Sequence, residues 1–209
     1  MCAASQPPTE ELLNRVCAGD RQASDALLTR HRERLRKMIR ARLDPRLQRR
    51  VDPSDVAQDA LAEAAQKLDD YARRRPLPFY PWLRQIAWER LVRLHRTHVV
   101  AANRSVCREA GDELRLPEES ALALAVSLRA EDTSPSGRAI GRELQARVRQ
   151  ALGSLSATDR EVLVLRHVEQ LSTKEVAAIL DKSPSAVKLR LLRALRRLQA
   201  ALEADGGET

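Results

Sequence analysis

The chain has 209 residues, of which 43% are hydrophobic and only 2% aromatic, and its formal net charge at pH 7 is +8. The shortage of aromatic residues indicates cores of small aliphatic side chains between helices, and the near absence of alternating β-branched residues argues against sheets, so we predict an all-α protein. The excess of arginine favours a polyanionic partner such as nucleic acid.

Other residue types exclude several classes of protein. The three cysteines are widely spaced and form no CxxC pair, which argues against a zinc knuckle or a disulfide framework and fits a reducing cytoplasm. The amino terminus lacks the regions of a signal peptide, and no segment is apolar for long enough to span a membrane. His95 and His98 have a spacing that suits a metal but no carboxylate or thiolate ligand nearby, so we expect no metal and no other cofactor.

The first predicted elements are two helices that follow a short polar tail at residues 1–8. One is expected from about Thr9 to Ala18 and the next from about Asp20 to Leu43. The arginines of the second helix point in too many directions to form one patch, so most of them are expected on a solvated face.

A third helix is predicted after a cap at Asp52 or Ser54, because apolar residues then recur at helical spacing as far as Leu68. The opposite face of this helix carries polar, mostly acidic side chains, which are Asp55, Gln58, Asp59, Glu63 and Gln66. Such a face would repel phosphate, so on a basic protein it favours a protein partner, with a plain solvated face as the alternative.

Three prolines within residues 72–81 predict a loop in that segment. The stretch FYPWLRQIAWERLVRLHRTH then predicts a helix that holds four of the five aromatic residues of the chain beside several arginines. Unpaired bases stack on rings while the nucleic-acid backbone follows cations, so the polar side of this helix is predicted to bind single-stranded DNA. Trp82, Leu83 and Ile86 are expected to face the core.

From Cys107 to about Arg138 the sequence becomes acidic and irregular, which is typical of a linker. The predicted organisation is a first domain at 9–105, a linker at 106–133, a second domain at 134–203 and a disordered tail at 204–209. The second domain is predicted to begin with helices at 134–152 and 156–167.

The segment STKEVAAILDKSPSAVKLRLLRALRRL predicts two capped helices with a tight turn between them. Ser172 and Glu175 have the spacing of a capping box, and Ser183 followed by Pro184 predicts the start of the second helix. An apolar stripe follows the second helix through Val187, Leu191, Ala194, Leu195 and Leu198, while the cations lie mostly off it. This layout is typical of a helix-turn-helix that reads DNA, with a solvated basic helix as the alternative.

Two longer segments resemble a known family. DVAQDALAEAAQKL followed by FYPWLRQIAWERLVRLHR resembles conserved region 2 of bacterial sigma factors, and ALGSLSATDREVLVLRHVEQLSTKEVAAILDKSPSAVKLRLLRALRRL resembles their region 4. With no third domain between the two matches, the chain is similar to the extracytoplasmic-function subgroup. The resemblance implies a protein that binds core RNA polymerase, melts promoter DNA and directs transcription initiation.

The resemblance also implies three binding surfaces. The acidic face would dock on the β′ clamp of the polymerase through Asp55, Gln58, Asp59 and Glu63. The loop at 69–78 would hold a flipped base, and the aromatic helix would bind the melted minus-10 element through Trp82, Arg84, Gln85, Trp88, Glu89 and Arg93. The second helix of the helix-turn-helix would read the minus-35 duplex through Ser185, Lys188, Leu189, Arg190 and Arg193. The β flap and an anti-sigma factor are further partners that the resemblance suggests.

One position departs from the family pattern, because Glu89 stands where many members place Asn. A carboxylate accepts a hydrogen bond from cytosine but repels phosphate, so the preferred minus-10 sequence stays open. Three other functions also stay open: a helix-turn-helix regulator that binds an operator without polymerase, an unspecific nucleic-acid chaperone, and an enzyme. The enzyme is disfavoured because no nucleophile and base pair or glycine-rich phosphate loop is recognisable.

Overall fold

The computed structural model describes residues 7–44, 47, 50–97, 147–148 and 150–204. The chain forms two compact units, Met1–Glu113 and Leu114–Thr209, and every described element in them is a helix. The all-α prediction is thus confirmed for the described part of the chain, while the predicted linker at 106–133 lies outside it. Among the described helices, none combines the length and the apolar character that crossing a membrane requires.

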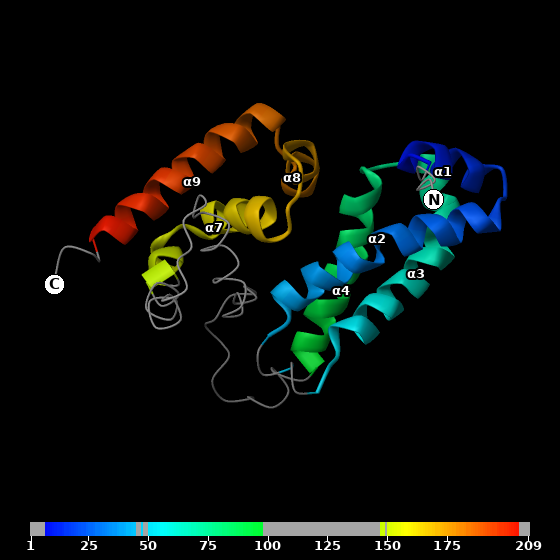
Figure 1. The fold of residues 1–209 in the computed structure, drawn as a ribbon, viewed down its shortest axis with the longest axis horizontal. Helices are drawn as coiled ribbons and strands as arrows, with labels where there is room; N and C mark the ends of the chain where they lie inside the picture. Colours follow the sequence, from blue (N-terminus) through cyan, green and yellow to red (C-terminus); the bar gives the residue numbers. More distant parts are fainter. Residues whose placement is uncertain (1–6, 45–46, 48–49, 98–146, 149, 205–209) are drawn as a thin grey trace, which may run out of the picture. The chain divides into compact units, whose positions relative to one another are not determined.

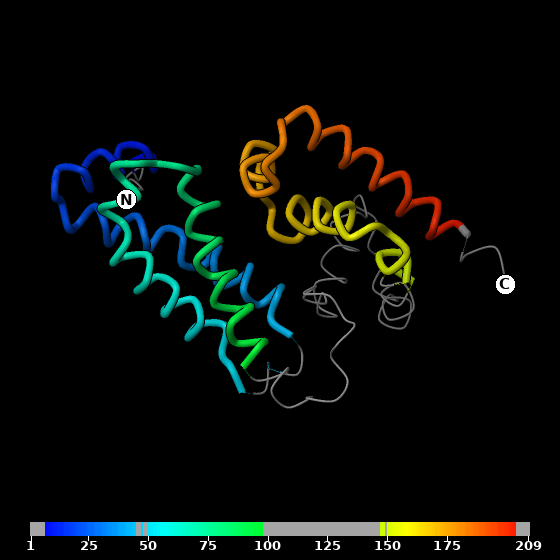
Figure 2. Tube along the Cα trace, turned by 180° about the vertical axis from the view of Figure 1, so that it is seen from behind, coloured from blue at the N-terminus to red at the C-terminus, as the bar shows by residue number. Residues whose placement is uncertain are grey.

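The first unit contains α1 (Thr9–Cys17), α2 (Arg21–Arg42), α3 (Pro53–Arg74) and α4 (Phe79–His95). The three long helices α2, α3 and α4 lie alongside one another, and α1 packs on α2 and α3 at the end of the unit where α3 leads into α4 (Figures 1 and 2). Side chains from all four helices form one core, in which Leu27, Leu35, Leu68 and Leu83 are almost completely buried. Burial of each such leucine contributes about 1.5–3 kcal/mol to folding.

Capping side chains explain where α2 and α3 begin. The Asp20 carboxylate accepts a hydrogen bond from the Ala23 amide at 3.2 Å, and the Asp52 carboxylate accepts one from the Ser54 amide at 2.7 Å. Of the two predicted caps for α3, the structure therefore uses Asp52, with Pro53 at the first helical position.

The predicted loop at 72–81 is wrong at both ends. Helix α3 continues to Arg74 and α4 begins at Phe79, so only residues 75–78 connect them. The proline at position 81 does not prevent the helix, because it lies in the first turn of α4, where a backbone amide has no partner inside the helix. Because α3 continues to Arg74, the base-holding loop predicted at 69–78 is helical over its first six residues.

The second unit contains α7 (Ala157–Leu163), a π-helical turn η2 (Val164–Val168), α8 (Thr173–Leu180) and α9 (Pro184–Ala204). Residues 147–148 and 150–154 are also helical, and the earlier part of the helix predicted at 134–152 lies outside the described residues. The core joins this helical segment to α7 and α9 through Val148, Ala151, Leu152, Leu155, Leu163, Ala194 and Leu198.

The capping chemistry predicted for the helix-turn-helix is confirmed. The Ser172 hydroxyl accepts a hydrogen bond from the Glu175 amide at 3.2 Å, and the Glu175 carboxylate accepts one from the Ser172 amide at 2.8 Å. The Ser183 hydroxyl accepts from the Ala186 amide at 3.2 Å, and Pro184 is the first residue of α9. Because each of these bonds joins residues three apart, the sequence pattern alone was sufficient to locate both helix starts.

Candidate nucleic-acid and protein interfaces

One face of α9 is exposed and carries the side chains predicted to enter a DNA groove. All five lie at the surface: Ser185, Lys188, Leu189, Arg190 and Arg193. The predicted apolar stripe faces the other way, and its members Val187, Ala194 and Leu198 are buried. Leu189 is 48% exposed, so a large apolar side chain lies in solvent among cations. Base edges present both hydrogen-bonding atoms and thymine methyl groups, and this mixed surface suits them.

The turn between α8 and α9 is tight and internally bonded. Asp181 ends α8 in the left-handed conformation at φ 51°, and the Lys182 amide donates to the Ala177 carbonyl oxygen at 3.0 Å. These bonds fix the amino end of α9 relative to α8. The amino end is the part of a recognition helix that usually contacts bases.

A buried carboxylate under α9 is a feature that the sequence did not reveal as functional. Asp159 of α7 is only 3% exposed and forms ion pairs with Arg190, at 3.5 Å, and with Arg197. In the sequence Asp159 resembled only an acidic residue in the first turn of a helix. The structure shows that it joins α7 to α9 and restrains one of the arginines predicted to contact DNA.

The acidic face predicted on α3 is partly neutralised within the unit. Arg90 of α4 donates to Asp59 at 2.7 Å and to Glu63 at 3.4 Å. Lys67 also donates to Glu63 at 2.7 Å, and this hydrogen bond lowers the pKa of Glu63 below its ordinary range. Asp55 and Gln58 are exposed, as predicted, whereas the Glu63 side chain is only 21% exposed.

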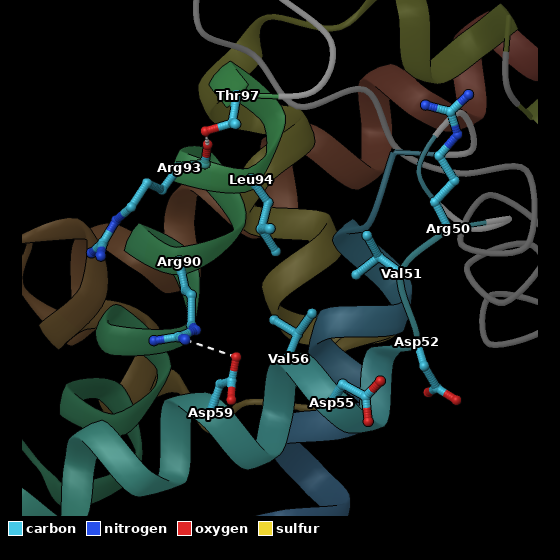
Figure 3. Close-up of a pocket in the computed structure, with 10 residues that line it drawn as sticks. All are labelled: Arg50, Val51, Asp52, Asp55, Val56, Asp59, Arg90, Arg93, Leu94 and Thr97. Carbon is cyan, nitrogen blue, oxygen red and sulfur yellow. Dashed lines mark hydrogen bonds and ion pairs between the residues drawn. The ribbon is translucent and has the colours of Figure 1, made fainter.

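A pocket of about 310 Å³ lies between the first half of α3 and the end of α4 (Figure 3). The apolar side chains of Val51, Val56 and Leu94 line its centre. Its rim is charged and polar and consists of Arg50, Asp52, Asp55, Asp59, Arg90, Arg93 and Thr97. Residues predicted for the polymerase face and a residue predicted for the DNA face, Arg93, therefore border the same pocket.

The solvent side of α4 carries three of the side chains predicted to bind unpaired DNA. Gln85, Glu89 and Arg93 follow one another at intervals of four residues and are exposed, and the Gln85 amide donates to the Glu89 carboxylate at 3.1 Å. Trp82 and Trp88 are partly buried against the core, so each ring retains some access to solvent. Beside them, Trp88, Glu89 and Arg93 contribute to an open hollow of about 540 Å³.

The prediction for Arg84 is wrong with respect to its position. Arg84 is only 6% exposed, and its guanidinium carbon lies 5.5 Å from the centre of the Trp88 ring, which Arg42 approaches to 5.3 Å from α2. Helix α4 packs against both α2 and α3, so it is buried on more than one side. Arg84 is therefore internal although it is charged. A cation near an aromatic face is attracted by the ring electrons, which favours this position.

The connection at residues 75–78 is held by aromatic and polar contacts. The Tyr71 ring stacks on Trp82 with 4.2 Å between centroids, and its hydroxyl donates to the Leu77 carbonyl oxygen at 2.8 Å. Burial raises the pKa of Tyr71 to about 12, so the hydroxyl stays protonated and continues to donate. Arg75, the first residue of the connection, is bonded to α1.

Of the two histidines in the metal pattern, only His95 lies in the described part of the chain, and within that part it belongs to no group of three or more possible metal ligands. His95 lies 3.3 Å from the Asp44 carboxylate, and His98 is outside the described part of the chain.

Comparisons with known proteins match both units. The family model for sigma-70 region 4 matches residues 145–198. The chain is 31% identical over 194 residues to RNA polymerase sigma factor CnrH of Cupriavidus metallidurans, covering 93% of this chain and 94% of CnrH. It is 32% identical to the ECF RNA polymerase sigma factor SigD of Mycobacterium tuberculosis, covering 90% of this chain and 81% of SigD. A solved structure of CnrH in complex with the cytosolic domain of CnrY matches 94% of this chain at 29% identity, with a TM-score of 0.54.

Proposed function

The chain belongs to the ECF family of RNA polymerase sigma factors, which direct transcription initiation, and we propose that its two units bind the two promoter elements. The single observation that carries the proposal is the exposed, acid-free face along the amino half of α9, presented by a helix-turn-helix whose two helices are both capped. The second unit is proposed to bind the minus-35 duplex, and the first unit the melted minus-10 strand.

At the minus-35 element, Lys188 and Arg193 are proposed to contact phosphates and base edges, with Ser185 and Leu189 at the amino end of α9 touching bases. Their exposure and their common face support this assignment. Arg190 is proposed to contact DNA from a fixed position, because its ion pair with Asp159 limits its reach.

At the minus-10 element, Gln85, Glu89 and Arg93 are proposed to contact the unpaired strand, with bases stacking near Trp82 and Trp88. Arg84 is buried and does not belong to this surface. The exchange of base stacking for contacts with rings and cations favours the melted state, and no covalent step is required.

The polymerase is proposed to bind the α3 face at Asp55, Gln58 and Asp59, with Glu63 in a supporting position behind its partners Lys67 and Arg90. Contact of the second unit with the β flap is proposed as well. Because the polymerase would hold the two DNA-binding units at a fixed separation, two weak contacts would act at high effective concentration.

Regulation by an anti-sigma factor in the cytoplasm is also proposed. Support comes from the similar structure, in which CnrH is in complex with the cytosolic domain of CnrY. A protein partner of that kind would compete with core polymerase for this chain.

The experiment that tests the proposed function is reconstitution with core RNA polymerase, followed by sequencing of RNA 5′ ends. A sigma factor yields discrete start sites that share two upstream motifs and that depend on the added chain. A conventional helix-turn-helix regulator would instead bind a specific duplex tightly in the absence of polymerase, and that outcome would overturn the proposal.

A further inference from the structure

We propose that Arg75 is a positioning residue that connects helix α1 to the strand-binding turn, and that it is not itself a DNA contact. The strand-binding turn comprises residues 75–78, between α3 and α4. This inference rests on the proposed function, because the turn borders the surface assigned to the unwound minus-10 strand. It makes α1 a part of the apparatus that holds that strand.

The backbone at Arg75 is the first observation. Arg75 caps α3 in the left-handed conformation, with φ 42° and ψ 55°, and its amide donates to the Tyr71 carbonyl oxygen at 2.7 Å. Glycine is the usual residue at such a helix end, because a β-carbon is disfavoured there. An arginine at this position has to be stabilised by the bonds that its side chain makes.

The side chain of Arg75 makes three such bonds. Its Nη1 donates to the Glu10 carboxylate at 2.9 Å and its Nη2 donates to the Asn14 side-chain oxygen at 2.7 Å, both on α1. Its Nε donates back to the Ala72 carbonyl oxygen at 3.1 Å, the same atom that accepts a hydrogen bond from the Cys17 thiol of α1 at 3.3 Å. One guanidinium thus bridges two consecutive turns of α1 and the last turn of α3.

The bonds of Arg75 fix the turn that follows it. One helical turn before Arg75, Tyr71 donates to the Leu77 carbonyl oxygen and stacks on Trp82, the first aromatic residue of the proposed strand-binding surface. The connection is thus held at two of its four residues, Arg75 and Leu77, next to that surface. A binding site holds its ligand well only when the groups around it are fixed in this way.

The neighbouring arginines provide the contrast. Arg73 and Arg74 are exposed, and Arg74 pairs with Asp70 on its own helix, at 3.1 Å with both side chains well exposed. These two cations point to solvent and are available to phosphate, whereas the guanidinium of Arg75 is occupied by α1. The three consecutive arginines at 73–75 therefore differ in role: two face solvent and one is bonded to α1. The sequence alone cannot distinguish them.

The decisive variant is Arg75→Gly, because glycine removes the side-chain bonds while favouring the left-handed backbone. Holoenzyme reconstituted with this variant is titrated with a fork-junction DNA that carries the mapped promoter with a single-stranded minus-10 segment. We expect this variant to bind the fork about tenfold more weakly than the wild type, because a loss of that size corresponds to the stacking energy of about one base. The melting temperature of the chain should change little, because the loss of these partly exposed bonds is offset by the lower cost of the left-handed backbone for glycine. Its affinity for core polymerase should be unchanged.

A charge exchange distinguishes positioning from direct contact. The variant Arg75→Glu should bind the fork weakly, and adding Glu10→Arg should restore a substantial part of the binding, because the pair between α1 and the turn is re-formed with reversed charges. Arg73→Ala serves as the matched control: as a lost phosphate contact it should reduce the salt dependence of binding, whereas Arg75→Gly should leave it unchanged.

Either of two results would overturn the inference: wild-type fork binding by Arg75→Gly, or no recovery in the exchange variant together with a reduced salt dependence in Arg75→Gly. Failure of the proposed function looks different, because wild-type holoenzyme would then show no preference for the fork over an unrelated fork of the same length.

Discussion

The buried carboxylate of Asp159 on α7 is ion-paired with the Arg197 guanidinium on α9, although the two residues are 38 positions apart in the chain. The same carboxylate also pairs with Arg190, two helical turns closer to the amino end of α9. One acidic residue thus holds the recognition helix against the helix that precedes the helix-turn-helix.

The first prediction concerns this carboxylate. Asp159→Asn keeps the size of the side chain but removes its charge, so both arginines lose their ionic partner. We expect the free energy of unfolding of the second unit to fall by about 1–2 kcal/mol, less than for a fully buried pair because both arginines are partly exposed. Urea unfolding followed by circular dichroism measures the change. The corresponding change from carboxylate to amide at an exposed position of α9, Glu203→Gln, is the control and should have little effect.

The second prediction concerns Arg193, an exposed residue of α9. Arg193→Ala should weaken binding of the holoenzyme to the minus-35 duplex by about 1–3 kcal/mol, because a cation facing the groove is lost. Affinity for core polymerase should not change. Fluorescence anisotropy with duplex DNA and with labelled polymerase measures the two quantities. Gln199→Ala, on an exposed position further along α9, is the control, and an equal loss in both assays for Arg193→Ala would contradict the assignment.

The third prediction concerns the acidic face of α3. Asp55→Lys should weaken core polymerase binding by about tenfold or more, since a charge facing the partner is reversed. It is a cleaner change than one at Asp59, which also pairs with Arg90 inside the unit. Surface plasmon resonance with core enzyme provides the affinity. Asp69→Lys makes the same change in net charge near the other end of α3, and comparable losses in both variants would argue for an unspecific charge effect.

The fourth prediction concerns pH. Burial, and to a smaller extent the neighbouring Arg166, lower the pKa of His167 below its ordinary value of about 6.5. As the pH falls below about 6.5, the unfolded chain takes up a proton at this histidine while the folded chain does not, so the free energy of unfolding decreases. His167→Gln removes this titration. Urea unfolding between about pH 7 and pH 5 should show a smaller loss of stability for the variant, and parallel curves for the two proteins would refute the prediction.

Helix starts and the two faces of α9 could be predicted from the sequence because the interactions that create them are local. A capping hydroxyl and the amide it bonds are three residues apart, as at Ser172 and Glu175, and the buried stripe of α9 repeats with the period of the helix. The same local logic located the exposed residues Lys188 and Arg193 and the polar face of α3.

The roles of Arg84, Arg75 and Asp159 were decided only by the tertiary structure. Arg84 is internal because α4 packs on two helices at once, whereas periodicity along one helix reveals a single apolar face with certainty. Arg75 finds its partners 61 and 65 residues away, and Asp159 finds Arg197 across 38 residues. A charged side chain looks the same in a sequence whether it faces water, DNA or an opposite charge on another helix, and only the packing of the helices determines which of these it meets.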